Sequence, residues 1–255
     1  MRNVSINLLD DTPRPVVAIG TDYSHGHLLP FHTHRRAQLL YGATGVMQVR
    51  THDGNWVVPP QRAVWIPAGV AHEVLMQGVS TRSLYIEPDA VDLGARCQVI
   101  SVSPLMRHLL MEAVEIPLTY EETGRDGVLI DLLLHEMTRS AHLPLHIPLP
   151  VESRLLGLCQ TFLQQPNAHQ SPQQWADQLH ISLRTFNRLF RQQTDLSFSQ
   201  WRQRACVVLA LARLAAGTPV TRIALDFGYD SPAAFSTMFR RVLGQPPSVW
   251  MQPSN

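Results

Sequence analysis

Two ten-residue segments in the C-terminal part of the sequence carry side chains that can recognise a nucleic acid. Residues 182–191 and 231–240 share the pattern Ser-x-x-x-Phe-x-x-x-Phe-Arg. A serine at the start of each segment is suited to cap a helix, and phenylalanines four residues apart lie on one helix face. Each segment therefore predicts a helix with a buried aromatic face and an opposite face that can contact a partner.

The outward face of the first predicted helix is rich in groups that bind base edges. The residues expected to pack inward are Leu183, Phe186, Leu189 and Phe190. The residues expected to face outward are Arg184, Thr185, Asn187, Arg188 and Arg191. Arg184 and Arg188 are one turn apart and can reach guanine edges, while Asn187 can pair with adenine. For each arginine, the alternative is a solvated helix surface without a ligand.

The outward face of the second predicted helix carries smaller groups. Near its start lie Ala233, Ala234, Ser236 and Thr237, and Phe235, Met238 and Phe239 are expected to face inward. Small apolar groups can touch thymine methyls but cannot make strong bidentate bonds. Arg240 and Arg241 are expected to meet phosphates, which position a protein on DNA without specifying a sequence. The first segment is therefore predicted to supply most of the base discrimination.

Each of these two helices follows a shorter predicted helix and a tight turn. The shorter helices contain Ala176 and Ala224, and a small residue there permits the close crossing of a helix-turn-helix. The two motifs are predicted at residues 171–192 and 219–242. Between them, residues 198–216 read as one helix ended by Gly217. Such a helix is roughly 28 Å long, near the roughly 34 Å repeat of DNA, so the motifs can enter successive major grooves.

Residues from about 155 to 250 resemble the DNA-binding domain of the AraC/XylS family. The segments that carry the resemblance are Trp175-Ala176, Ile223-Ala224-x-x-Phe227-Gly228-Tyr229, Phe235, Phe239-Arg240 and Gly244-x-Pro246-Pro247. The resemblance implies a monomeric domain with two helix-turn-helix motifs joined by a linker helix. Members of this family usually activate or repress nearby promoters.

Histidines in the N-terminal part of the chain indicate a second site. His32 and His34 are two residues apart, so on a strand they share one face. The spacing Gly26-x5-His32-Thr-His34-x3-Gln38-x6-Gly45 resembles the first cupin motif, with Gln38 where that family has glutamate. Pro67-x-Gly69-x2-His72 resembles the second motif, although Gln61 and Met76 replace its flanking glycine and asparagine. The front domain therefore resembles a small cupin barrel.

The cupin resemblance implies a metal site. In metal-binding cupins the matching positions, here His32, His34, Gln38 and His72, hold a divalent ion. Neutral imidazoles would suit Zn, Ni, Fe, Mn or Cu. Two alternatives remain open: the histidines bind an organic effector by hydrogen bonds, or they are satisfied inside a filled barrel. AraC-type regulators mostly use this barrel for a small effector, and Tyr41 and Trp65 are the candidate apolar lining of that effector pocket.

Local sequence patterns divide the chain into two domains. Apolar runs broken by Gly and Pro predict strands at 38–41, 46–50, 55–58, 63–66 and 84–86, and apolar periodicity predicts helices at 103–116 and 126–139. The three prolines at positions 144, 148 and 150 predict an irregular linker. The predicted fold class is multidomain α+β: a cupin-like β-barrel (1–100), a helical coupling or dimerisation segment (101–142), a linker (143–152) and an all-α domain with two helix-turn-helix motifs (153–255).

Charge and cysteine usage fit this organisation. Up to Glu152 there are eleven Arg and sixteen acidic residues, whereas the remainder has ten Arg and four acidic residues, and the sequence has no Lys. The basic half is the expected partner of a polyanion. Cys97, Cys159 and Cys206 are odd in number and fit reduced thiols. With no signal-peptide pattern and no long apolar segment, we expect a cytoplasmic protein without a membrane function.

The expected function is sequence-specific regulation of transcription, controlled by a small-molecule or metal effector. The expected partners are double-stranded DNA, the effector, a second copy of the chain in a homodimer, and RNA polymerase. The apolar stripe at Leu129, Leu132, Leu133 and Met137 can pair two chains or pack on its own barrel. The alternatives are a metal-dependent cupin oxygenase or isomerase with accessory DNA binding, which the missing glutamate disfavours, and an architectural DNA protein without a sensor. The leading prediction is a regulator and not an enzyme.

Overall fold

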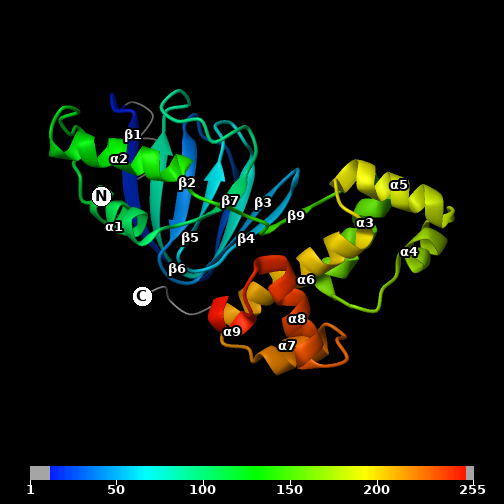
Figure 1. Ribbon diagram of the computed structural model, residues 1–255. Coiled ribbons are helices and arrows are strands. Elements are labelled where there is room, and N and C mark those ends of the chain that lie inside the picture. The colour runs from blue at the N-terminus through cyan, green and yellow to red at the C-terminus, as the bar shows by residue number, and fades with distance from the viewer. Residues whose placement is uncertain (1–11, 251–255) are drawn as a thin grey trace. The chain divides into compact units, whose positions relative to one another are not determined.

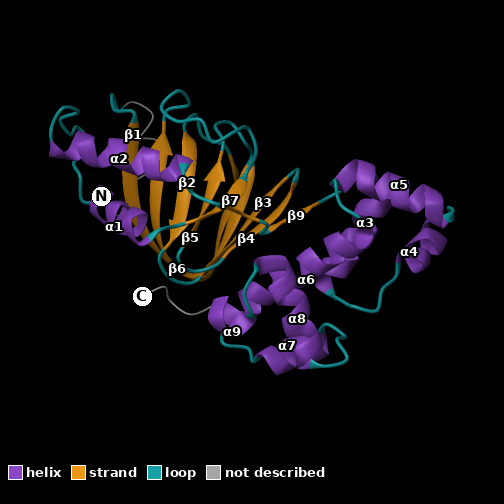
Figure 2. Cartoon of the chain, in the orientation of Figure 1, coloured by secondary structure: helices purple, strands orange, loops and turns teal. Residues whose placement is uncertain are grey.

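The computed structural model describes residues 12–250, and these divide into two compact units. Within the described residues, the first unit consists of Thr12–His52 together with Val58–Leu143, and the second consists of Asp53–Val57 and Pro144–Trp250. Strands make up most of the first unit and helices most of the second (Figure 2). This confirms the predicted combination of a cupin-like sheet domain and an all-α domain.

The strands of the first unit form a curved antiparallel half-barrel. They are β1 (Val16–His32), β2 (Ala37–Gly42), β3 (Val46–Thr51), β5 (Arg62–Ile66), β6 (His72–Ile86), β7 (Gln98–Ser101) and β8 (His142–Leu143). Their order is β8-β7-β5-β2-β6-β3, and β1 pairs with the opposite edge of β6. The predicted strands 38–41, 46–50 and 63–66 lie within β2, β3 and β5. The long strands β1 and β6 were missed or shortened because they contain polar residues and Gly26 or Gly78.

Two helices cover one face of this sheet (Figure 1). They are α1 (Pro104–Ala113), which begins after the N-cap Ser103, and α2 (Arg125–Thr138). Their apolar residues share a core with sheet side chains such as Leu39, Trp65 and Leu84. The apolar stripe of α2, a candidate for pairing two chains, has residues in two environments. Leu129, Leu133 and Met137 are in this core, whereas Leu132 is 43% exposed. Most of the stripe therefore packs on its own sheet.

A short β-ribbon belongs to the second unit. Strand β4 (Gly54–Val58) pairs antiparallel with β9 (His146–Pro148), and all but the last residue of β4 lie in that unit. The indole Nε1 of Trp201 donates a hydrogen bond of 2.8 Å to the carbonyl oxygen of Pro148. The prediction that the whole segment 143–152 is irregular was wrong for β9. A strand that is paired on one side tolerates a proline at its end, because the missing N–H is not needed there.

The helices of the second unit agree closely with the sequence patterns. They are α3 (Ser153–Gln164), α4 (Pro172–Leu179), α5 (Leu183–Thr194), α6 (Phe198–Ala215), α7 (Val220–Asp226), α8 (Pro232–Leu243) and α9 (Pro247–Trp250). Ser171 and Ser197 form capping boxes with Gln174 and Gln200. Such caps satisfy backbone N–H groups that have no partner inside the helix, so helix starts are marked locally in the sequence.

An aromatic cluster holds α4, α5 and α6 together. Trp175 lies at its centre, with its ring centroid 4.8 Å from Phe198 and 5.9 Å from Trp201. Phe186 and Phe190 pack against the same ring, and all five side chains are buried. Edge-to-face aromatic pairs add about 0.5–1.5 kcal/mol each beyond the burial of area. This cluster fixes the orientation of α5, whose opposite face carries the predicted DNA contacts.

Candidate functional site

The first helix-turn-helix consists of α4, a tight turn and α5. His180 adopts the left-handed conformation with φ of 56° and ends α4. Two residues later Ser182 caps α5, and its hydroxyl accepts a hydrogen bond from the backbone N–H of Thr185. Ala176 is fully buried in α4. The small side chain and the abrupt turn bring two helices together, as the motif requires.

The second helix-turn-helix consists of α7, a glycine turn and α8. Gly228 has φ of +73°, and a Cβ there would lie 2.9 Å from the side-chain oxygen of Asn167. A larger residue here would be strained in this backbone conformation and would have to displace the side chain of Asn167. Ser231 caps α8 by accepting from the N–H of Ala234 at 3.1 Å, and Ala224 is fully buried in α7. The two motifs are thus built in the same way, although their turn residues differ.

The exposed faces of α5 and α8 contain the predicted DNA contacts. Arg184, Asn187, Arg188 and Arg191 are exposed on α5, and Ala233, Ala234, Thr237, Arg240 and Arg241 are exposed on α8. Thr185 and Ser236 are half-buried, and the Thr185 hydroxyl is hydrogen-bonded to Ser182. Leu183, which was expected to face inward, is 37% exposed because it occupies the first turn beyond the aromatic core.

Ion pairing separates two kinds of arginine in this unit. Arg213 and Arg222 both pair with Asp226, so their charge is balanced inside the protein. No described carboxylate forms an ion pair with Arg184, Arg188, Arg191, Arg240 or Arg241. These five side chains all lie on the two exposed faces, where a guanidinium can meet phosphates or base edges.

The first unit brings His32, His34 and His72 together, although they come from two strands and a loop. One ring nitrogen from each lies within 4.8 Å of the others. Strand pairing sets His32 of β1 opposite His72 of β6, with ring centroids 4.4 Å apart. His34 lies in the connection to β2, and its ring centroid is 5.1 Å from that of His72. His72 is fully buried and His34 is 6% exposed.

Backbone carbonyls orient all three imidazoles in the same way. Nδ1 of His32, His34 and His72 lies 2.8, 2.5 and 2.8 Å from the carbonyl oxygens of Pro30, Arg36 and Val70. A carbonyl can only accept, so each Nδ1 is the donor, and in the neutral ring each Nε2 offers a lone pair. Burial lowers the pKa of His72 to about 4, so this ring is neutral. Nothing in the sequence indicated these three carbonyls.

Gln38 completes the cluster from strand β2. Its Oε1 lies 3.1 Å from Nε2 of His34, and its Nε2 lies 3.1 Å from the hydroxyl of Tyr85. Two acceptors that face each other need a shared cation, a proton on the imidazole or a rotated amide. Nε2 of His72 has no hydrogen-bond partner among the described residues. Sequence reasoning missed Tyr85, whose role follows only from its pairing opposite Gln38.

Tyr41 and Trp65 lie on the other face of the sheet. Both are in the core under α1 and α2, and neighbouring residues on a strand point to opposite faces, so Tyr41 cannot point to the same side as Gln38. The indole of Trp65 donates to the carbonyl oxygen of Gly94. An effector pocket lined by these two residues would therefore be separate from the histidines. Tyr41 instead lines a separate groove of about 490 Å³ beside α1.

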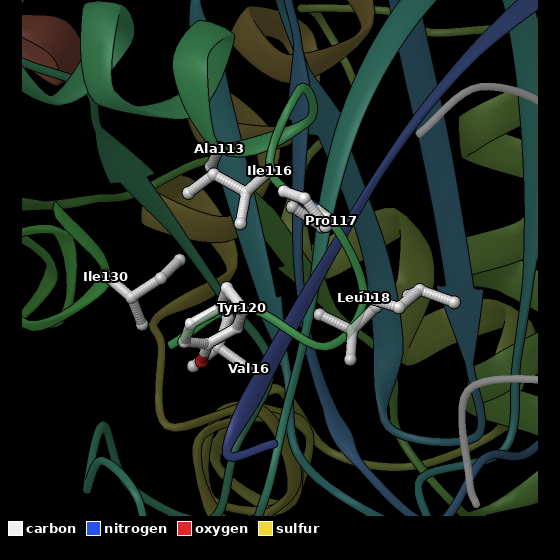
Figure 3. Close-up of a pocket in the computed structure, with 9 residues that line it drawn as sticks. Val16, Ala113, Ile116, Pro117, Leu118, Tyr120 and Ile130 are labelled. Atoms are coloured by element: carbon white, nitrogen blue, oxygen red, sulfur yellow. The ribbon is translucent and has the colours of Figure 1, made fainter. Parts of the chain in front are cut away.

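A second cavity lies between β1 and the segment that follows α1. Figure 3 shows Ala113, Ile116, Pro117, Leu118, Tyr120 and Ile130 around it, together with Val16 of β1. Its volume is about 10 Å³, which is the size of a single water site. This cavity is too small for an organic effector.

Comparison with known proteins agrees with both units. Residues 175–252 match the family described as a helix-turn-helix domain, and residues 14–137 match the AraC-like ligand binding domain. The HTH-type transcriptional regulator NimR of Escherichia coli (strain K12) is 34% identical over 223 residues, which cover 87% of this chain and 82% of NimR. Among solved structures, apo ToxT from Vibrio cholerae has a TM-score of 0.38 at 13% identity and covers 94% of this chain and 98% of that one. The DNA-binding domain of AdpA in complex with target DNA has a TM-score of 0.34 at 29% identity and covers 37% and 86%.

The fold and its exposed arginines define a DNA-binding regulator with two helix-turn-helix motifs and a separate ligand-binding domain. The chain belongs to the AraC family of transcriptional regulators. Within the residues described, no helix is both long enough and apolar enough to span a bilayer.

Proposed function

We propose that this regulator senses a divalent transition metal ion, held by Nε2 of His32, His34 and His72 with Oε1 of Gln38 as a fourth ligand. The observation that carries the proposal is the shared orientation of the three imidazoles, whose Nδ1 atoms are tied to backbone carbonyls. Histidines that ligate a metal are commonly oriented in this way by an outer partner. The ions that suit this neutral donor set are Zn, Ni, Fe, Mn and Cu.

The chemistry of the site supports a cation better than an internally satisfied cluster. Nε2 of the fully buried His72 lacks a partner within the described part of the chain, and leaving a buried polar atom unpaired costs about 1–3 kcal/mol. Oε1 of Gln38 and Nε2 of His34 also face each other as acceptors. A cation at the centre would satisfy all of these atoms together, and the metal would supply Lewis-acid coordination of an effector group.

The test is metal content and DNA binding of the full-length protein. We expect inductively coupled plasma mass spectrometry to find about one transition metal ion per subunit in the purified protein. The variants His72→Ala and His32→Ala should lose this ion. The exposed His135→Ala is the matched control and should retain the ion. Removal of the metal should change affinity for a duplex selected from a random library at least about five-fold by fluorescence anisotropy. Equal metal content in all three variants would overturn the proposal.

Sensing, rather than turnover, is the use of the site that we propose. The relative that covers most of this chain is a transcriptional regulator. Gln38 also stands where metal-dependent cupin enzymes have a carboxylate, and an uncharged amide is a weaker ligand for a catalytic ion. Consumption of dioxygen by the iron- or manganese-loaded protein would favour the enzyme alternative. Loss of DNA binding on addition of an organic effector to the metal-free protein would favour hydrogen bonding by the histidines if His72→Ala abolished that response.

We further propose that the chain acts as a homodimer and that it contacts RNA polymerase at its promoters. Val128 and Leu132 are 62% and 43% exposed and lie one turn apart on α2, which supports a helix-mediated dimer. Sedimentation of wild type and Leu132→Glu tests the dimer, and transcription in vitro with purified polymerase decides between activation and repression. A monomer at all concentrations would contradict the first of these proposals.

A further inference from the structure

The groove that Tyr41 lines is separate from the histidine cluster. Its lining residues are Tyr41 of β2, Ala43 directly after β2, Gln61 directly before β5, and Arg107, His108 and Met111 of α1. The volume of about 490 Å³ is within the range of small-molecule sites. Since Tyr41 and Gln38 point to opposite faces of the sheet, a ligand in this groove cannot touch the histidines.

The charged groups around the groove are predominantly positive. Arg107 of α1 and Arg82 of β6 form no ion pair with any carboxylate in the described chain, and Arg82 donates instead to Ser80 and to the carbonyl oxygen of Thr81. Arg82 is 7% exposed and directly opposite Tyr41 in the strand pairing. His108 of α1 also lines the groove.

Two acidic side chains on neighbouring elements are engaged elsewhere. Asp22 accepts a hydrogen bond of 2.6 Å from the hydroxyl of Ser80, and Glu112 at the end of α1 pairs with Arg125 at 3.2 Å. Neither carboxylate lines the groove. Burial raises the pKa of Tyr41, while Arg107, Arg82 and Arg62 act in the opposite direction. The lining therefore includes the guanidinium of Arg107 and no carboxylate.

The rest of the lining carries no charge. Met111 is 40% exposed, and Ala43 and Gln61 also line the groove. Gln61 has φ of 60°, and its N–H is hydrogen-bonded to the carbonyl oxygen of Gly42 at 2.8 Å. A left-handed conformation is unfavourable for a residue with a side chain, and it persists only where the surroundings hold it. This loop wall is thus fixed before a ligand arrives.

We propose that this groove is an effector site for a small organic anion, in which a flat apolar body lies against Met111 and Ala43 and a carboxylate pairs with Arg107. A guanidinium matches a carboxylate in shape and charge, which favours this class of ligand over a neutral one. The proposal names a ligand class for the family's ligand-binding domain and is independent of metal at the histidines. Only the expected effect of the ligand on DNA binding rests on the proposed regulator function.

The binding test compares 2-naphthoate with its neutral counterpart 2-naphthylmethanol by isothermal titration calorimetry of the full-length protein. We expect 2-naphthoate to bind at one site per subunit and at least about ten times more tightly than the alcohol. Arg107→Gln should remove that preference while leaving the alcohol's affinity within two-fold. Arg139→Gln, an exposed arginine outside the groove, is the matched control and should behave as wild type.

A second pair of variants keeps the test independent of Arg107. Met111→Glu places a negative charge in the groove and should weaken 2-naphthoate about ten-fold, while Leu105→Glu, exposed on the same helix but outside the lining, should not. Equal affinity for both probes, or equal binding by Arg107→Gln and wild type, would overturn the proposal. His32→Ala should still bind 2-naphthoate, so failure of the metal proposal is distinguishable from failure of this one.

Discussion

The two helix-turn-helix motifs share one internal framework and differ on their outer faces. In α5 and α8 alike, a serine caps the helix and two fully buried phenylalanines lie four residues apart. The exposed positions hold long polar side chains such as Arg184, Asn187 and Arg188 on α5 and small ones such as Ala233 and Ala234 on α8. The residues that build the motif and the residues predicted to read DNA are therefore separate sets, and the exposed set can vary without removing the buried framework.

The largest expected effect tests whether the two frameworks are equivalent. Phe186→Ala and Phe235→Ala each remove a fully buried ring, and each should lower the free energy of unfolding by about 3–5 kcal/mol. Urea denaturation followed by circular dichroism measures the change. Leu183→Ala, at a site 37% exposed, is the control and should cost much less. A small loss at only one of the two phenylalanines would mean that the motifs are not built alike.

The next effect tests the difference between the outer faces. Arg188→Ala should reduce discrimination by about 1–3 kcal/mol at one base pair, because a bidentate contact to guanine is lost. Binding to a panel of duplexes with single base changes measures it, with the neighbouring exposed Gln192→Ala as the control. An equal loss of affinity on every duplex would assign Arg188 to a phosphate instead.

The helix caps should show equal, smaller effects in the two motifs. The hydroxyls of Ser182 and Ser231 each accept a backbone N–H at 3.1 Å. Ser182→Ala and Ser231→Ala should each lower the free energy of unfolding by about 1 kcal/mol, because a helix N–H loses its partner. Thermal denaturation measures this loss. Ser199→Ala, at an exposed position inside α6, should have little effect, and a similar loss there would show that the caps are not responsible.

The smallest expected effect distinguishes an arginine that positions the protein on the DNA backbone from one that reads bases. Arg240→Gln should weaken binding about equally on all duplexes and reduce the slope of log affinity against log salt by about 0.9, as expected when one phosphate contact is lost. Anisotropy at several salt concentrations measures the slope. If the loss were confined to duplexes with one particular base, Arg240 would be a reading residue and the contrast between α5 and α8 would weaken.

Prediction from sequence was most successful where structure depends on local patterns. Serine caps, turn residues and the spacing of phenylalanines located both motifs, because these signals act within one or two helical turns. The spacing of His32, His34 and His72 also predicted their convergence. It did not reveal Tyr85 or the carbonyls that orient the rings, because those neighbours are set by strand register between distant segments.

The sequence by itself determined which helices form, which of their faces are aromatic and which arginines remain on the outside. Only the tertiary structure decided that Tyr41 and Trp65 lie under α1 and α2, that Leu129 and Leu133 pack on their own sheet, and that β4 joins β9 in the second unit. The physical reason is that periodicity along the chain assigns residues to one face of a helix or strand. Pairing between distant segments of the chain decides which residues that face contacts.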